Sequence, residues 1–440
     1  MRKMRTWTII AVGAVALAAC SNGDDGGSTT PTATAPATDE ATGGEGGSTE
    51  IPDAPDDGVT ATEIRIGWMG DLTGPTVAAQ GLNFAGSEAA VAWYNENGGV
   101  LGRQLVLVEK DDQYGAEVAA TNYSALVNDD KVLALLNMGG SHISTALIPN
   151  MESDGIALIG PAQTIDAQIE SANIFNNLAH YGDQADVAVQ YMGEQLGGVD
   201  QAVVAVVHLE VPSGSEWNTY IQAEVEEGGG TYVGAIPLSP ASPDYAGTVT
   251  RLRQMIDSNG VNFVAFHASP AQALGLATEL ASQAVDVPVI GIQGIAASSI
   301  FQEGPPEAGD QFLGVHSFLP STGDCEMCAT IQEFVAGTEW ESSATEANFS
   351  QGWLDIMITV EAIERAAADA GEVTRATLLE ALNGPFETGG LSCPIDWSSS
   401  THSACAAPFR WNSGDSRLEV VEDFGFWADA IDGEYGLFEG

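Results

Sequence analysis

The expected fold is decided by residues 64–112, which run "IRIGWMGDLTGPTVAAQGLNFAGSEAAVAWYNENGGVLGRQLVLVEKDD". The stretches at 63–70 and 104–112 are short and rich in Ile, Val and Leu, which is typical of buried strands. Between them, apolar residues recur at helical spacing over 81–99, and two glycines close the pattern. This order predicts two parallel strands joined by a crossover helix.

The same alternation continues along the chain and restarts once, after "LAHYGDQ" at 178–184. Before this point the further predicted strands are 131–137 and 156–160, and the helices 116–127 and 144–153. After it the predicted strands are 202–209, 231–238, 263–268 and 288–294, and the helices 184–198, 217–227, 244–260 and 271–284. Two successive α/β series, too long together for one core, predict two lobes, each a doubly wound parallel sheet.

The first twenty residues have the pattern of an export signal. Three cations occur among the first five residues, an apolar run follows over 7–17, and Leu-Ala-Ala-Cys ends at Cys20. This resembles a bacterial lipobox, which predicts a lipoprotein signal peptide at 1–19 and lipidation of Cys20. A plain signal peptide with an incidental cysteine is the alternative.

Residues 20–58 consist mainly of Gly, Ser, Thr, Pro, Asp and Glu. A chain of this composition buries too little apolar surface to fold, so we expect a lipidated, disordered tether. No later segment has the 18 uninterrupted apolar residues of a membrane span.

The chain carries 61 acidic against 13 basic residues, a net charge of −48. This field repels polyanions, which excludes nucleic acid as a partner. We expect a solvated acidic surface. Attraction of cationic ligands, the alternative, would need the acids to cluster at a cleft.

Four cysteines follow Cys20, and an even number in an exported protein favours two disulfides. Proximity favours Cys325 with Cys328 and Cys393 with Cys405 among the three possible connectivities. The "CEMC" pair at 325–328 leaves a redox motif or half of a zinc site as alternatives.

A candidate binding loop is "LLNMGGSHIST" at 135–145, where two glycines, a serine and a histidine follow an apolar strand. In parallel sheets ligands bind beyond the carboxyl ends of the strands. Glycines there let a ligand approach the main chain. The loop therefore predicts one lip of a ligand site.

Residues 64–112, together with 260–280 and 288–294, resemble the leucine/isoleucine/valine-binding protein family. These are type I periplasmic binding proteins that supply ABC importers. The resemblance runs from about residue 64 to 411. It implies two lobes joined by three crossover segments, near 181–184, 316–319 and 398–408. The implied lobe one is 59–182 with 318–400, and lobe two is 183–317 with 401–440.

The resemblance also implies how a ligand is held. The family's carboxylate-binding serine and backbone groups fall at Ser141 and Gly140. Its ammonium-binding carbonyl and hydroxyl fall at Ala162 and Thr164. A helix cap by Ser141 or Ser144, with no ligand, is the alternative reading of the first loop.

Three positions depart from the family. Gln293 occupies the position of the family's ammonium-binding acid. Ser213 replaces the tyrosine of the lobe-two loop, and Gln80 replaces the aromatic residue of the first loop. The ligand is therefore expected to carry a carboxylate or similar acceptor at one end. Its other end is expected to be neutral, or an ammonium met by a relocated acid, for which Asp71 is the candidate. Two further candidates for ligand contact are Tyr181, at the first crossover, and His267, at the end of a lobe-two strand.

These inferences predict an extracytoplasmic, lipid-anchored receptor, monomeric and without catalysis, cofactor or metal. It would capture a branched-chain amino acid, another amino acid or an amide-like compound for an ABC permease and ATPase. One alternative is a sensory receptor of the same fold. A surface hydrolase is the other, although the sequence has no G-x-S-x-G, H-E-x-x-H or P-loop motif.

Overall fold

The computed structural model of the protein describes residues 51–295, 304–305, 311–402, 405–412 and 417–421. The predicted signal peptide, Cys20 and most of the predicted tether lie outside the described residues, as do residues 422–440 of the predicted lobe two. Within the described ranges, no helix combines the length and apolar character that a membrane crossing requires.

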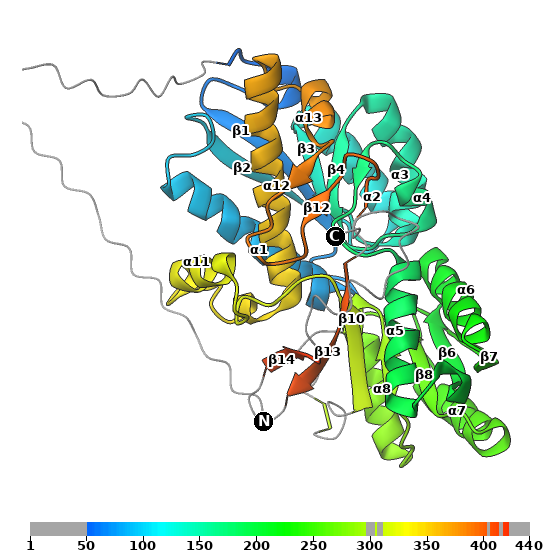
Figure 1. The fold of residues 1–440 in the computed structure, drawn as a ribbon. Helices are drawn as coiled ribbons and strands as arrows, with labels where there is room; N and C mark the ends of the chain where they lie inside the picture. Colours follow the sequence, from blue (N-terminus) through cyan, green and yellow to red (C-terminus); the bar gives the residue numbers. More distant parts are fainter. Residues whose placement is uncertain (1–50, 296–303, 306–310, 403–404, 413–416, 422–440) are drawn as a thin grey trace, which may run out of the picture. The chain divides into compact units, whose positions relative to one another are not determined.

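The first sheet has five parallel strands in the order β2-β1-β3-β4-β5 (Figure 1). The strands are β1 (Glu63–Gly70), β2 (Gln104–Asp111), β3 (Ala134–Asn137), β4 (Ala157–Pro161) and β5 (Ile174–Phe175). The residues of β3 and β4 are fully buried, as the continuous apolar runs predict for central parallel strands. The connecting helices are α1 (Val77–Glu96), α2 (Ala116–Ser124), continued by a π-helical turn (Ala125–Asp129), α3 (Ser141–Asp154) and α4 (Asp166–Ile169).

The second sheet has seven described strands in the order β14-β13-β10-β9-β8-β6-β7. The parallel strands are β6 (Val203–Leu209), β7 (Thr231–Leu238), β8 (Phe263–His267), β9 (Val289–Gly291) and β10 (Phe312–His316). Two further strands, β13 (Ala407–Asn412) and β14 (Arg417–Val420), are antiparallel, so this sheet is mixed rather than wholly parallel. Its helices are α5 (Tyr181–Leu196), α6 (Pro212–Glu227), α7 (Tyr245–Asn259) and α8 (Pro270–Ser282).

The chain passes between the two lobes three times: between β5 and α5, after β10, and before β13. Between the second and third crossings it adds α11 (Glu326–Val335), α12 (Ala347–Ala370), α13 (Arg375–Ala381) and a short hairpin, β11 (Pro385–Phe386) with β12 (Ile395–Asp396). Residues of α11, α12 and α13 share one apolar core with β1, β3 and β4, so this late segment belongs to lobe one. The predicted fold class of two α/β lobes is confirmed, and the predicted boundaries between the lobes stay a prediction.

Helices α1 and α12 cross in unusually close contact, and Figure 1 shows them side by side. A Cβ atom added at Gly86 would overlap the carbonyl oxygen of Phe349, and one added at Gly352 would overlap that of Asn83. The Ser87 hydroxyl donates to the Gly352 carbonyl at 3.2 Å. Glycine is required at this crossing because the two backbones leave no room for a side chain.

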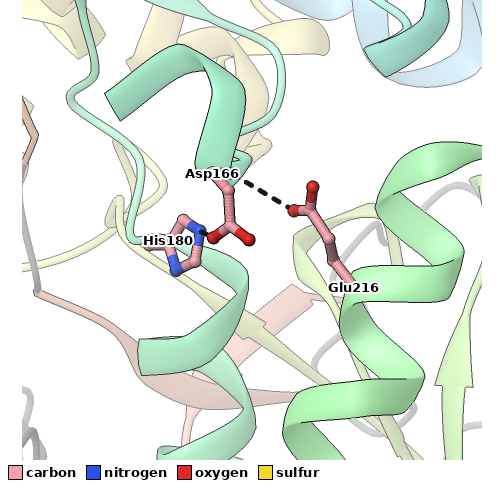
Figure 2. Close-up of side chains that lie close together, drawn as sticks. All are labelled: Asp166, His180 and Glu216. Carbon is pink, nitrogen blue, oxygen red and sulfur yellow. Dashed lines mark hydrogen bonds and ion pairs between the residues drawn. The ribbon is translucent and has the colours of Figure 1, made fainter. Parts of the chain in front are cut away.

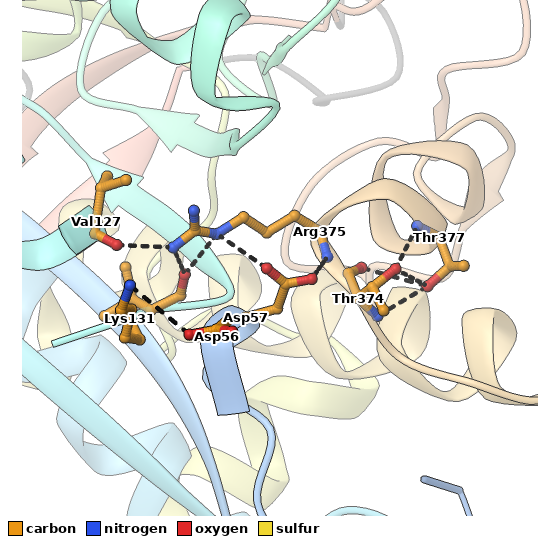
Figure 3. Close-up of polar contacts among 8 residues, drawn as sticks. Asp56, Asp57, Val127, Lys131, Thr374, Arg375 and Thr377 are labelled. Atoms are coloured by element: carbon orange, nitrogen blue, oxygen red, sulfur yellow. Dashed lines mark hydrogen bonds and ion pairs between the residues drawn. The ribbon is translucent and has the colours of Figure 1, made fainter. Parts of the chain in front are cut away.

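The segment before β1 corrects the predicted tether, because packed chain begins at Ile51 rather than after residue 58. Ile51 is buried in the lobe-one core, and Pro55–Asp57 forms a 3-10 turn. Figure 3 shows Asp57 accepting a hydrogen bond from the Arg375 backbone N–H, at 3.2 Å. The Arg375 guanidinium also donates to the carbonyls of Val127 and Val132. Composition alone missed this segment because Arg375, from a distant part of the chain, holds it in place in addition to its own buried Ile51.

Both predicted disulfides are present, Cys325 with Cys328 and Cys393 with Cys405. Their Cα atoms lie 5.0 and 5.9 Å apart, inside the range that a disulfide spans. The first bridge begins α11, where the Cys328 N–H donates to the Cys325 sulfur. The second encloses the third crossing between the lobes.

Candidate ligand-binding site

A cavity of about 90 Å³ lies at the carboxyl ends of strands from both sheets. Lobe one lines it with residues of α1 and α12 and of the loops after β3 and β4. Lobe two contributes the chain that follows β6, β8 and β9. One buried water needs only about 10–15 Å³, so the space fits a solute of a few heavy atoms.

Seven of the nine residues predicted to bind ligand line this cavity. They are Gln80, Gly140, Ser141, Ala162, Tyr181, His267 and Gln293. Their convergence from two sheets is the arrangement that the resemblance implies. Their contact with a ligand stays a prediction.

Thr164 does not line the cavity, which corrects its predicted role. The side chain is fully buried, and its hydroxyl donates to the Leu178 carbonyl at 2.7 Å. The hydroxyl therefore ties the loop after β4 to the segment that leads into the first crossing.

Asp71 is also absent from the lining, so it is not the relocated acid that the sequence suggested. It is fully buried, and its carboxylate accepts hydrogen bonds from the backbone N–H groups of Thr73, Gly74 and Thr76. The Thr76 hydroxyl adds a fourth bond at 2.7 Å. These bonds fold the loop between β1 and α1, and α1 consequently begins at Val77 instead of residue 81.

The glycines after β3 make room for the protein's own amides. The Gly140 N–H donates to Gln163 Oε1 at 2.9 Å. At Gly139 an added Cβ would overlap the Gln80 side chain. Gly140 has a φ of 104°, a backbone conformation that favours glycine, and the close approach of a ligand to this loop stays a prediction.

Ser141 joins the two lobes. Its hydroxyl donates to Ser213 Oγ at 3.0 Å and accepts from the Ser213 backbone N–H at 3.3 Å. Ser213 belongs to α6 of lobe two. The N-cap of α3 is Gly140, and no side chain caps this helix start, so the helix-cap alternative is wrong.

Amide side chains dominate the lining, and sequence analysis missed most of them. Besides Gln80 and Gln293, the cavity is bordered by Asn83, Asn137, Gln163, Asn348 and Gln351. The described residues that border it include no Asp, Glu, Lys or Arg. Burial lowers the pKa of His267 to about 3, so this side chain is neutral at pH 7. Asn137 ends a predicted strand beside the candidate loop, a signal that could have identified it, whereas Asn348 and Gln351 lie on a helix hundreds of residues later and carry no local motif.

A second cluster, shown in Figure 2, consists of Asp166 on α4, His180 at the start of α5 and Glu216 on α6. His180 Nδ1 accepts from the Gly182 N–H at 3.0 Å, so its proton lies on Nε2, which faces Asp166 Oδ1 at 3.0 Å. A metal at Nε2 would need that nitrogen bare, which conflicts with the Gly182 bond. The Asp166 N–H donates to Glu216 Oε2 at 3.3 Å. The cluster is therefore a hydrogen-bonded link between α4 and α6.

The model of the periplasmic binding protein family matches residues 63–415. The chain belongs to this family. One relative is a leucine-, isoleucine-, valine-, threonine- and alanine-binding protein of Pseudomonas aeruginosa. It is 26% identical over 82% of this chain and 93% of that protein. Another is a Leu/Ile/Val-binding protein homolog of Brucella melitensis, 24% identical over 76% of this chain and 89% of that protein.

Solved structures share the two-lobed fold of this periplasmic binding protein. A fatty acid ABC transporter substrate-binding protein from Thermomonospora curvata has a TM-score of 0.77 at 21% identity, covering 86% of this chain and 96% of that one. A branched-chain amino acid ABC transporter protein from Thermus thermophilus, with bound valine, has a TM-score of 0.72 at 22% identity, covering 82% and 96%. At these sequence identities, the structural similarity establishes the fold alone.

Proposed function

We propose that this protein is the extracytoplasmic solute-binding component of an ABC importer, held to the cell membrane by a lipid on Cys20. It captures a small polar solute between its lobes and presents it to a permease and ATPase. The observation that carries the proposal is the cavity itself, which both lobes line at the carboxyl ends of their strands. It binds without chemical turnover and needs no cofactor.

The names of the relatives support a role in solute binding. The related proteins of Pseudomonas and Brucella are named for amino acids, and the structural neighbours for a fatty acid, for valine and, in one from R. palustris, for 4-hydroxybenzoate. A cavity of about 90 Å³ favours a compact solute over a long acyl chain.

The contacts between the lobes support a mechanism of closure around the solute. Ser141 bonds to Ser213, and the Gln293 amide donates to the Ala162 carbonyl at 3.2 Å. Because these bonds form only when the lobes meet, a solute that contacts both lobes shifts the population toward the closed state.

The test is a thermal-shift screen of amino acids, amides and small organic acids, followed by calorimetry on each hit. Ser141→Ala should weaken binding of the hit by roughly 1–3 kcal/mol, because it removes a hydroxyl that borders the solute and couples the lobes. Thr145→Ala is the control, since Thr145 lies next to this helix turn in α3 but is exposed and does not line the cavity. The proposal fails if no solute raises the melting temperature, or if Ser141→Ala and Thr145→Ala bind the hit with equal affinity.

A further inference from the structure

Asn137 lines the lobe-one side of the cavity and carries an amide oxygen without a hydrogen-bond partner. Its Nδ2 donates to the Met69 carbonyl at 3.1 Å and to Gln80 Oε1 at 3.0 Å. A backbone carbonyl only accepts, so the amide nitrogen has to face Met69, which fixes the orientation of the group. Asn137 Oδ1 is left buried and without a hydrogen-bond partner.

Gln293 repeats this arrangement from lobe two. Its Nε2 donates to the Ala162 carbonyl at 3.2 Å and to the Tyr181 hydroxyl at 3.4 Å. The Ala162 carbonyl fixes this amide in the same way. Gln293 Oε1 is buried and has no partner. Each lobe therefore brings one unmatched acceptor to the same cavity.

His267, which also lines the cavity, has both ring nitrogens buried and without partners. A neutral imidazole carries one N–H donor and one acceptor. It can therefore accept one hydrogen bond from a solute and donate one to it. Its ring meets Tyr181 edge to face, with centroids 5.4 Å apart, which holds it in place.

A buried acceptor without a donor costs free energy, so these atoms define what the solute has to supply. We propose that the ligand of this protein is an uncharged solute with N–H or O–H donors at both ends, of which a small diamide is the simplest example. This inference rests on the proposed function. One end donates to Asn137 of lobe one and the other to Gln293 of lobe two, so the same donors that satisfy the protein close it.

The lining also explains why a charged ligand is disfavoured. A carboxylate facing Asn137 Oδ1 or Gln293 Oε1 would place lone pairs against lone pairs. An ammonium would meet no carboxylate among the described residues that line the cavity. The Gly140 N–H and the Ser141 hydroxyl, the donors expected for a ligand carboxylate, are bonded to Gln163 and Ser213 instead.

Calorimetry with five probes tests this inference: malonamide and succinamide, their dianions malonate and succinate, and L-valine. At least one diamide should bind at millimolar concentration or tighter, and more tightly than its dianion and than L-valine. Gln293→Leu should weaken diamide binding about tenfold or more, because an acceptor worth roughly 1.4 kcal/mol or more is lost. Gln254→Leu, at an exposed glutamine of α7 in the same lobe, should leave it unchanged.

Gln293→Glu provides an independent readout, since it puts a carboxylate at the position where the family resemblance implies an ammonium-binding acid. This variant should lose diamide affinity and gain L-valine affinity. The inference is overturned if neither diamide binds the unaltered protein, if a dianion or L-valine binds at least as tightly, or if Gln293→Leu has no effect. Binding of L-valine alone would leave the proposed function standing, whereas failure of every solute in the wider screen would remove both.

Discussion

Buried carboxyl groups make the stability of this protein depend on pH. Burial raises the pKa of Asp112 and that of Glu216 to about 7, and raises those of Asp183 and Asp355 well above the ordinary value. In the unfolded chain these groups ionise near their ordinary values, about pH 4. Between about pH 4 and 7 these carboxyl groups therefore hold protons in the folded protein that the unfolded chain releases, and their contribution to stability falls as pH rises through this window.

Buried histidines act in the opposite direction. Burial lowers the pKa of His267 and that of His316 to about 3, and that of His402 to about 4. The unfolded chain binds protons at these histidines below about pH 6.5 and the folded protein does not, so their contribution to stability falls as pH drops below that value.

Comparison with a variant isolates the carboxyl contribution. Between pH 5 and pH 8, the melting temperature of Asp112→Asn should rise relative to that of the unaltered protein, because the substitution removes one of the carboxyl groups of raised pKa while keeping the oxygen that accepts from the Tyr114 N–H. Asp257→Asn, at an exposed position of α7, should show no such relative change. Calorimetric melting across this range is the measurement, and equal pH slopes for Asp112→Asn and the unaltered protein would contradict the assignment.

Individual site residues were harder to predict from sequence than their neighbourhood. The position of the loop after β3 followed from the apolar run and the glycines, but the partners of its donors did not. Gln163 and Ser213, which bond to Gly140 and Ser141, lie 23 and 72 residues away from them in the chain. Asp71 looked available because sequence does not show how many N–H groups a loop turns toward one carboxylate.

At the scale of elements, strands with strong apolar patterns were predicted well, including β1 and β7 over their full lengths. Helix starts were less accurate, since α1 and α3 begin three or four residues before the predicted points, where loop hydrogen bonds rather than apolar spacing decide. The antiparallel strands β13 and β14 were not predicted. Both strands are short. β13 pairs with β10, about 100 residues earlier, which local pattern does not reveal, and β14 pairs with β13.

The crossing of α1 with α12 makes the most specific prediction about an element. Gly86→Ala should destabilise the protein by about 1–3 kcal/mol, because the added methyl group forces the helices apart. Gly81→Ala on the same helix meets only a Val77 methyl at 3.6 Å and should stabilise by about 0.5–1 kcal/mol. Denaturant unfolding compares the two. Equal changes in the free energy of unfolding would mean that the crossing tolerates a side chain at Gly86.

Gly86→Ala should also weaken solute binding, since α1 carries Gln80 and Asn83 and α12 carries Asn348 and Gln351. Separation of the helices would move these amides away from the cavity. Normal affinity in a destabilised Gly86→Ala protein would show that the site does not depend on the crossing.

For the whole molecule, the excess of acidic residues dominates. With a net charge of −48, like charges repel across the surface at low ionic strength. Six ion pairs between Lys or Arg and Asp or Glu occur among the described residues, too few to offset this excess.

We therefore expect the melting temperature to rise between dilute buffer and molar potassium chloride, because salt screens repulsion within a Debye length of about 10 Å at 0.1 M. Sorbitol at matched osmolality is the control, because it is excluded from the protein surface but does not screen charges. A flat or falling curve in salt would mean that repulsion does not limit stability.

The hydrogen bonds that hold residues 51–57 against lobe one have a mechanical consequence. Arg103 donates to the Ile51 carbonyl at 2.9 Å, and Arg375 bonds to Asp57, so tension on the chain ahead of Ile51 is transmitted to the first sheet. The three crossings between the lobes are not part of the chain that carries this tension. If the protein is tethered as proposed, lobe one is the stationary part, and lobe two swings without pulling on the anchor.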